Sequence, residues 1–175
     1  PDMAPKRITR TGHASWTLAD FAFTRPPFHA FVSGATITPS GTSGTIQLTA
    51  SQDVFAALHV GAVIRLAGKR VQVTAVSGPR NATATVLDAL PGTDATGDWD
   101  ESTFSAARGW PVTACFHQAR LVLGGSRDLP NQLWLSRSGD LGDFDQGTGL
   151  DDEGIAFALM SDQVCLLYTS DAADE

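Results

Sequence analysis

The sequence predicts an all-β protein, and three observations support this fold class. Apolar residues at helical spacing are almost absent along the 175 residues. Short stretches rich in Val, Ile, Thr, Phe and Trp are instead separated by Gly, Pro, Ser, Asn and Asp. Hydrophobic residues make up 42% of the chain and charged residues 18%, which is a globular rather than a disordered composition.

Residues 1–34 are predicted to form an extended arm. Short strands are expected at 8–10 and 15–18, on either side of the turn residues Thr11 and Gly12. Two consecutive prolines follow, and because proline has no N–H to donate, they cannot lie in a central strand. The arm is therefore expected to contribute only short or edge strands.

Residues 35–91 are predicted to form a small β-barrel or sandwich. The segment 45–49 alternates, which places Ile46 and Leu48 on one face. Ser51 is expected to cap a single helical turn. Three further strands are expected at 60–66, 71–76 and 82–87, joined by tight turns.

A polar linker is expected at 92–101, with Trp99 as its aromatic anchor. Residues 102–164 then resume short strands, expected at 112–116, 120–123, 132–135 and 155–160. Strands that return at this spacing are typical of one propeller blade. A single blade cannot stand alone, because its apolar faces need neighbouring blades.

Both ends of the chain indicate a fragment of a longer gene. The chain opens on Pro1 rather than an initiator Met. Residues 165–175 can be back-translated, codon for codon, into the transposase-end adapter of shotgun sequencing libraries, so we expect this segment to be an artefact. Without its three acids the net charge changes from −7 to −4, with 16 acids against 12 bases. The segment also contains Cys165, so no disulfide with Cys115 is predicted.

Composition excludes several function classes. A mildly acidic chain without basic clusters is not expected to bind nucleic acid irrespective of sequence. No run approaches the roughly 20 apolar residues that span a bilayer, and the first seven residues do not resemble a secretion signal. We therefore predict no membrane partner.

Two residue pairs were considered for catalysis. Cys115 and His117 lie two apart on a predicted strand and face the same way, but no third group that could orient the histidine is apparent. Cys115 is accordingly predicted to be a small buried residue. Asp98 and Glu101 could serve a glycan-cleaving enzyme only if their carboxylates converged in a cleft. We predict no enzyme activity, no catalytic residue and no cofactor.

The acidic segment from Asp140 to Glu153 leaves two alternatives open, a solvated surface loop or an irregular calcium site. The calcium loop of an EF-hand is excluded, because a loop that starts at Asp143 has Gly147 at position 5 and Gly154 at position 12. The four histidines have no metal-ligand spacing, and no metal site is predicted.

Three residues of the last zone are predicted to be structural. Trp134 is expected to pack against a neighbouring blade, and Trp110 to anchor the entry to the first strand. Arg120 is expected to pair with Asp140 or Asp143.

Many short motifs occur in one order across residues 5–164. They include I-T-P-S-G-x-x-G-T-I-x-L-T-A-S, x-V-G-x-x-I-R-L, x-V-T-A-V, W-x-E, R-G-W-P, F-H-x-x-R-L-V-L-G-G-S and W-x-S-x-S-G-D-x-x-x-F. Here they are residues 37–51, 59–66, 71–76, 99–101, 108–111, 116–126 and 134–144. The set resembles the tail nozzle, or tail tubular protein B, group and the related hub proteins of tailed bacteriophages and gene-transfer agents. The barrel is similar to the first catalytic-cysteine half-domain of ubiquitin-activating enzymes, a half-domain that lacks the nucleophile.

This resemblance implies a small β-barrel inserted in a partial β-propeller, the propeller strands coming from residues 1–34 and 102–164. It implies a homo-oligomeric ring in the virion tail, assembled in the bacterial host cytoplasm with other tail proteins. DNA would pass through the ring without specific binding, and the acidic loop could line such a channel because negative charge repels phosphate. The alternative function is a tail-associated module that binds host-surface glycan.

Overall fold

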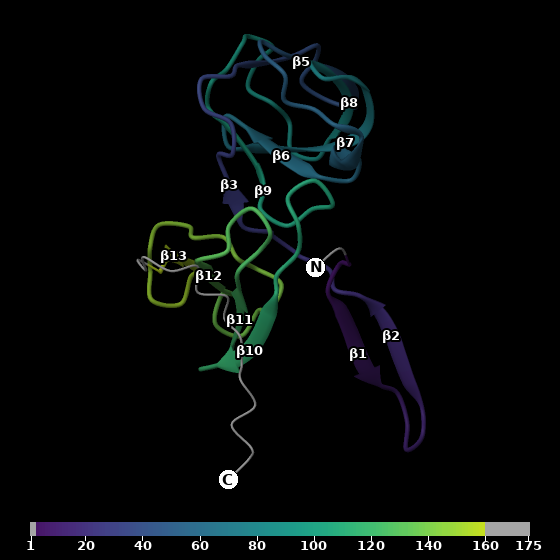
Figure 1. The fold of residues 1–175 in the computed structure, drawn as a ribbon, viewed down its shortest axis with the longest axis vertical. Helices are drawn as coiled ribbons and strands as arrows, with labels where there is room; N and C mark the ends of the chain where they lie inside the picture. The colour runs from purple at the N-terminus through teal and green to yellow at the C-terminus, as the bar shows by residue number, and fades with distance from the viewer. Residues whose placement is uncertain (1–2, 160–175) are drawn as a thin grey trace. The chain divides into compact units, whose positions relative to one another are not determined.

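The computed structural model describes residues 3–159, and within them the protein is all-β, as the sequence predicts (Figure 1). The predicted adapter segment 165–175 lies outside the described residues, as does the last residue of the strand expected at 155–160. The chain divides into two compact units, one formed by residues 28–107 and the other by the segments that precede and follow it. The described part contains no helix that is long and apolar enough to cross a membrane.

Residues 3–159 contain thirteen strands and one short 3-10 helix. The strands are β1 (Lys6–Arg10), β2 (Trp16–Asp20), β3 (Phe28–His29), β4 (Ile37–Pro39), β5 (Thr45–Ala50), β6 (Val63–Leu66), β7 (Lys69–Gly78), β8 (Asn81–Val86), β9 (Trp99–Ser102), β10 (Thr113–His117), β11 (Arg120–Gly124), β12 (Gln132–Leu135) and β13 (Ile155–Ala158). The 3-10 helix η1 spans Ala57–His59.

The unit of residues 28–107 is one antiparallel sheet in the order β3-β9-β6-β7-β8-β5-β4. The residues of β5 alternate between exposed and buried, so Ile46 and Leu48 share the buried face as predicted. Their neighbours in the core come from strands β4 to β9 and the loops next to them: Ala35, Ile37, Ala50, Val54, Phe55, Ile64, Leu66, Val71, Val73, Ala82, Ala84, Leu90 and Trp99. The curved sheet thus buries its own core.

The sheet is not closed by its strand ladders, although its far edge returns toward its beginning. Ile37 of the edge strand β4 forms an isolated bridge with Thr96, with N···O distances of 2.9 and 3.0 Å. Three residues later the chain enters β9, which pairs with β6. This bridge brings the two ends of the sheet together without a continuous ladder.

The end of the segment predicted to be a linker is in fact the strand β9. Trp99 lies opposite Leu66 in the neighbouring strand, and its indole N–H donates to the carbonyl of Ala35 at 2.8 Å. Asp100 lies opposite Arg65, and the two form an ion pair. The polar groups of β9 have hydrogen-bond and ion-pair partners elsewhere in the fold. Its polar composition therefore predicted a linker although the segment forms a strand.

The helical turn predicted after Ser51 is wrong. The hydroxyl of Ser51 accepts the backbone N–H of Thr36 at 2.9 Å, which fixes a loop rather than a helix start. The chain forms its 3-10 helix six residues later, and Leu58 within that helix is exposed. A tertiary hydrogen bond therefore decided the local conformation in place of capping propensity.

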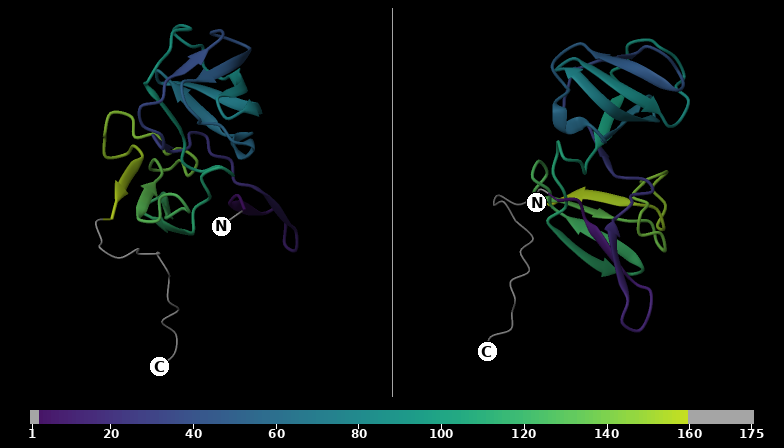
Figure 2. Two further views of the ribbon diagram at one scale, coloured as in Figure 1. Left: turned by 45° about the horizontal axis from the view of Figure 1, so that its top comes forward. Right: turned by 90° about the vertical axis from the view of Figure 1, so that its right-hand side faces the viewer.

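The other unit contains a hairpin and a four-stranded sheet (Figure 2). Strands β1 and β2 pair antiparallel in the arm segment. Strands β10 to β13 form an antiparallel sheet in chain order, and each lies within two residues of its predicted position. Trp134 and Leu123 are cross-strand partners and each is only 2% exposed, so they form the buried face of this sheet.

Candidate functional site

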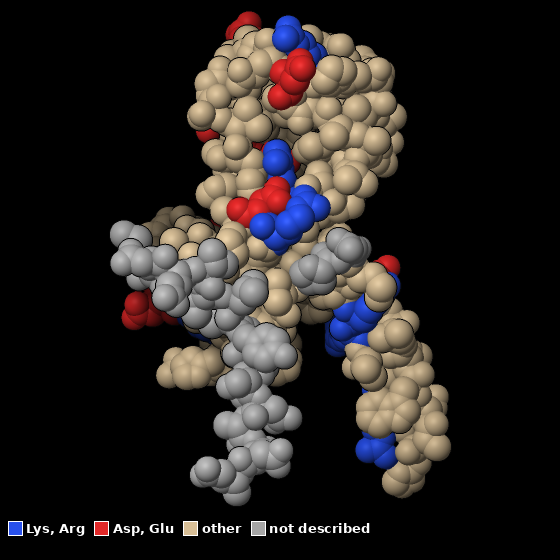
Figure 3. Space-filling view, viewed as in Figure 1, with Lys and Arg blue, Asp and Glu red and all other residues tan. Residues whose placement is uncertain are grey.

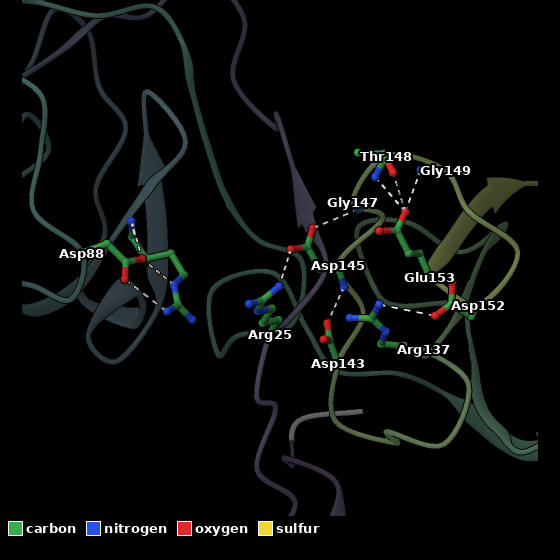
Figure 4. A network of polar contacts seen from close by, with 11 residues as sticks. Arg25, Asp88, Arg137, Asp143, Asp145, Gly147, Thr148, Gly149, Asp152 and Glu153 are labelled. Carbon is green, nitrogen blue, oxygen red and sulfur yellow. Dashed lines mark hydrogen bonds and ion pairs between the residues drawn. The ribbon is translucent and has the colours of Figure 1, made fainter.

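The acidic loop (residues 140–153) lies between β12 and β13 and carries six carboxylates. Figure 4 shows four of them, those of Asp143, Asp145, Asp152 and Glu153. Glu153 stabilises the C-terminal part of this loop. Its carboxylate accepts backbone N–H groups from Leu150, Thr148 and Gly149 at 2.9, 2.7 and 2.8 Å. These hydrogen bonds, that of Leu150 first, hold the pKa of Glu153 below its ordinary value. These backbone N–H groups thus form an anion-binding turn, and the carboxylate of Glu153 from the same loop occupies it.

Gly147 shows how closely the chain wraps this carboxylate. Its φ is +48°, and a Cβ added there would lie 2.2 Å from a carboxylate oxygen of Glu153. Any other residue would displace that carboxylate as well as strain the backbone. The glycine that breaks the calcium-loop pattern therefore has a structural role, which is to leave space for Glu153.

The remaining loop carboxylates are mostly engaged inside the same unit. Asp145 forms an ion pair with Arg25 at 3.0 Å, and Asp152 pairs with Arg137 at 3.4 Å. Asp143 is buried and accepts the backbone N–H of Asp145, and Asp140 accepts that of Gly142. Asp140, Asp151 and Asp152 remain exposed, so the loop still presents negative charge to solvent.

Arg120 is buried, but its predicted pairing with Asp140 or Asp143 is wrong. Its guanidinium donates to the carbonyl oxygens of Ser136 and Glu153 at 2.7 and 2.6 Å, and to that of Asp151. A planar guanidinium with five N–H groups suits such a set of carbonyls. Arg120 therefore fixes the backbone of the loop against the end of the sheet and neutralises no carboxylate.

The loop carboxylates do not converge. Within residues 3–159 there is no group of three or more His, Cys, Asp or Glu side chains that could hold a metal ion. Their hydrogen bonds to separate backbone groups account for this, because each carboxylate is drawn to a different part of the loop. The loop therefore folds by satisfying its own backbone donors.

Cys115 lies on the edge strand β10 and is exposed, so the prediction of a buried cysteine is wrong. His117 is exposed on the same strand and lies opposite Arg120. The error arose because β10 pairs on one side only, and one face of its sheet is not covered in this unit.

A cavity of about 620 Å³ lies in the same unit and was not predicted from the sequence. It falls within the size range of small-molecule sites. Three aromatic residues contribute to its wall, Phe21, Phe23 and Phe116, of which Phe116 is 74% exposed. Periodicity could not reveal it, because the wall combines the arm, β10, β11 and the start of the acidic loop.

A buried His–Glu pair in the unit of residues 28–107 was also not predicted from the sequence. His59 of η1 and Glu101 of β9 approach to 3.2 Å, and both are at least 95% buried. The backbone N–H of Ala56 donates to the other imidazole nitrogen, Nδ1, at 2.9 Å. Asp98, in contrast, is exposed. Glu101 thus anchors η1 to the sheet and does not form an open cleft with Asp98.

Comparison with known proteins gives no assignment, since no family model matches the chain and no curated protein sequence matches it.

Proposed function

We propose that this chain is a structural component of a bacteriophage or gene-transfer-agent tail, of the nozzle or hub type, and that it forms part of an oligomeric DNA-exit channel. The observation that carries the proposal is the apolar sheet surface that one unit leaves open. The motifs, which resemble those of tail nozzle proteins and occur in the same order, support the assembly into a tail.

The four-stranded sheet β10–β13 is apolar on both faces. Trp134 and Leu123 are buried on one face, whereas Ile155 and Phe157 on the other are 40% and 43% exposed. A four-stranded antiparallel sheet with two apolar faces is the repeating unit of a propeller, in which each blade covers the next. This supports the interpretation of β10–β13 as one blade.

The arrangement of the chain supports an inserted barrel. Residues 28–107 form a compact unit that interrupts the other one. Their sheet is curved enough for Ile37 to meet Thr96 near its opposite end. Barrels avoid exposed sheet edges by such closure. We propose that this unit is the small barrel of a nozzle-type protein.

The proposed partners are other copies of the chain in a ring, other tail proteins, and DNA that passes without specific binding. The exposed carboxylates Asp140, Asp151 and Asp152 would repel phosphate where they faced a channel. The protein would reside in the virion tail after assembly in the host cytoplasm.

The experiment that tests the proposal is electron microscopy of the purified full chain, combined with sedimentation velocity. We expect closed rings with a central hole and no shift of duplex DNA in a mobility assay at moderate salt. A chain that remains monomeric at every concentration, or that binds duplex DNA tightly, would contradict the proposal.

A second candidate function has one observation in its favour, the aromatic wall of the 620 Å³ cavity. Exposed aromatic rings such as Phe116 are suited to stacking on sugars. If the chain is a host-surface glycan-binding module, Phe116→Ala should abolish retention on host polysaccharide. Phe157→Ala, outside that wall, is the matched control. No retention of the unaltered chain would remove this candidate.

A further inference from the structure

The β1–β2 hairpin has one face on which three large apolar side chains are mostly exposed. The register pairs Ile8 with Leu18 and Arg10 with Trp16, so these side chains lie on the same face. Ile8, Leu18 and Trp16 are 68%, 67% and 61% exposed. An isolated two-stranded hairpin is marginally stable in water, so this face needs a partner.

The second open surface is the uncovered face of β10–β13, which we call the acceptor face. The register places Val122, Leu135 and Ile155 in one cross-strand row and Leu133 and Phe157 in the next, all on the same side. The three central residues of the face are half-buried, and Ile155 and Phe157 on the edge strand are exposed. The two rows contain no charged side chain.

The two surfaces have opposite charge at their borders. The arm, residues 3–20, carries Lys6, Arg7 and Arg10 against Asp20, a net charge of +2 (Figure 3). The acidic loop contains six acids and no base, and it leads directly into β13. The side chain of Asp151 is exposed there, four residues before β13 begins at Ile155.

We infer that the β1–β2 hairpin is an intermolecular arm, which lays its apolar face on the acceptor face of a second copy of this chain. Sheet faces pack on one another about 10 Å apart through interdigitated side chains. Ile8, Leu18 and Trp16 of the arm, and the two rows of the acceptor face, supply apolar side chains to such a contact. Opposite charges at the two borders favour arm against acceptor and disfavour arm against arm. This inference rests on the self-assembly in the proposed function and names the contact that produces it.

An arm that binds a different surface on the next copy makes a heterologous interface. Such an interface generates a closed ring or an open filament, except where two copies exchange arms reciprocally and form a symmetric dimer. Because the arm supplies only three large apolar side chains, we expect it to bury less than the roughly 800 Å² per partner that is typical of a stable complex. A single contact is therefore expected to be reversible. Ring closure gives each copy two contacts, one as donor and one as acceptor.

The test uses the full chain in sedimentation velocity over a wide concentration range. The arm variant Ile8→Thr/Leu18→Thr replaces one cross-strand pair with residues that favour strands. The acceptor variant Ile155→Thr/Phe157→Thr changes only exposed positions of β13. Ala19→Thr, on the opposite face of the hairpin, is the matched control. Circular dichroism spectra should be the same for all four proteins.

We expect each double variant alone to be monomeric and the control to assemble like the unaltered chain. An equimolar mixture of the two double variants retains one intact arm and one intact acceptor, so it should form a one-to-one dimer and nothing larger. Rings that survive both double variants would overturn this inference and leave the proposed function standing. An arm variant that abolishes assembly while the acceptor variant does not would indicate an arm-to-arm contact and would overturn it too. An unaltered chain that stays monomeric would overturn both.

Discussion

The two units differ in where their apolar residues lie. In residues 28–107 the large apolar side chains of the sheet point into one core, and seven of them are at most 3% exposed: Ile37, Ile46, Leu48, Ile64, Leu66, Val71 and Val73. In the other unit, three large apolar residues of the hairpin and two of β13 are at least 40% exposed. The first unit completes its own fold, whereas the second presents surface that suits assembly.

The difference shows that strand content alone does not make a finished domain. Both units are antiparallel sheets, but only the seven-stranded one is curved enough to bury one face against itself. A flatter four-stranded sheet has two faces, and at most one of them can be buried by the short segments around it.

Trp134→Ala should destabilise its unit by about 3–5 kcal/mol, because it removes a buried aromatic side chain and leaves a cavity. Phe157→Ala, on the open face of the same sheet, should cost the isolated chain less than about 1 kcal/mol. Urea unfolding followed by circular dichroism measures both. If both variants lowered the free energy of unfolding equally, the two faces of the sheet would not differ in burial.

Leu48→Ala should destabilise the unit of residues 28–107 by about 2–5 kcal/mol, since this side chain is completely buried in a core that cannot collapse around the space. Leu58→Ala is the matched control in the same unit, at an exposed position. Its effect should be within about 0.5 kcal/mol. If Leu48→Ala lowered the free energy of unfolding as little as Leu58→Ala does, in thermal and urea unfolding, the core of this unit would not be tightly packed.

Arg120→Met should destabilise the four-stranded sheet and the acidic loop by about 2–4 kcal/mol, because three carbonyl oxygens lose a charged donor. Arg80→Met removes an exposed ion pair with Asp53 and should cost less than about 1 kcal/mol. Limited proteolysis near residues 146–151 should detect the loosened loop. A loop as resistant as in the unaltered chain would contradict the anchoring role of Arg120.

Glu153→Gln should have the smallest effect and a local one. The lowered pKa of Glu153 means that the ionised carboxylate stabilises the turn at neutral pH. This contribution is present above the ordinary glutamate pKa and is lost as the pH falls through the lowered one. Hydrogen-exchange protection of the Thr148, Gly149 and Leu150 amides should therefore fall on acidification. In Glu153→Gln, protection should be lower at neutral pH and insensitive to this titration.

The sequence predicted the strands in which apolar and polar residues alternate. β5 is the clearest case, since Ile46 and Leu48 are buried between exposed threonines and glutamine. The strand β12 was also placed correctly, because it is bounded by a Pro-Asn turn and a Ser-Arg-Ser segment. In these segments the pattern of apolar and polar residues agrees with the tertiary structure. The pattern alone was therefore enough to predict the strands.

The strand β9 and the contacts of Arg120 were missed for a shared reason. Both depend on polar groups whose partners lie far away in the sequence, Arg65 for Asp100 and the loop carbonyls for Arg120. Periodicity reports which face of a strand is apolar, and it carries no information on where a buried polar group finds its partner. The His59–Glu101 pair was out of reach for the same reason.

Hydrogen-exchange mass spectrometry of the full chain at low and high protein concentration tests the central claim most directly. We predict that amides in β1–β2 and β10–β13 gain protection as concentration rises, while those in β4–β8 are strongly protected at both concentrations. Protection that is the same in both units and independent of concentration would contradict the account.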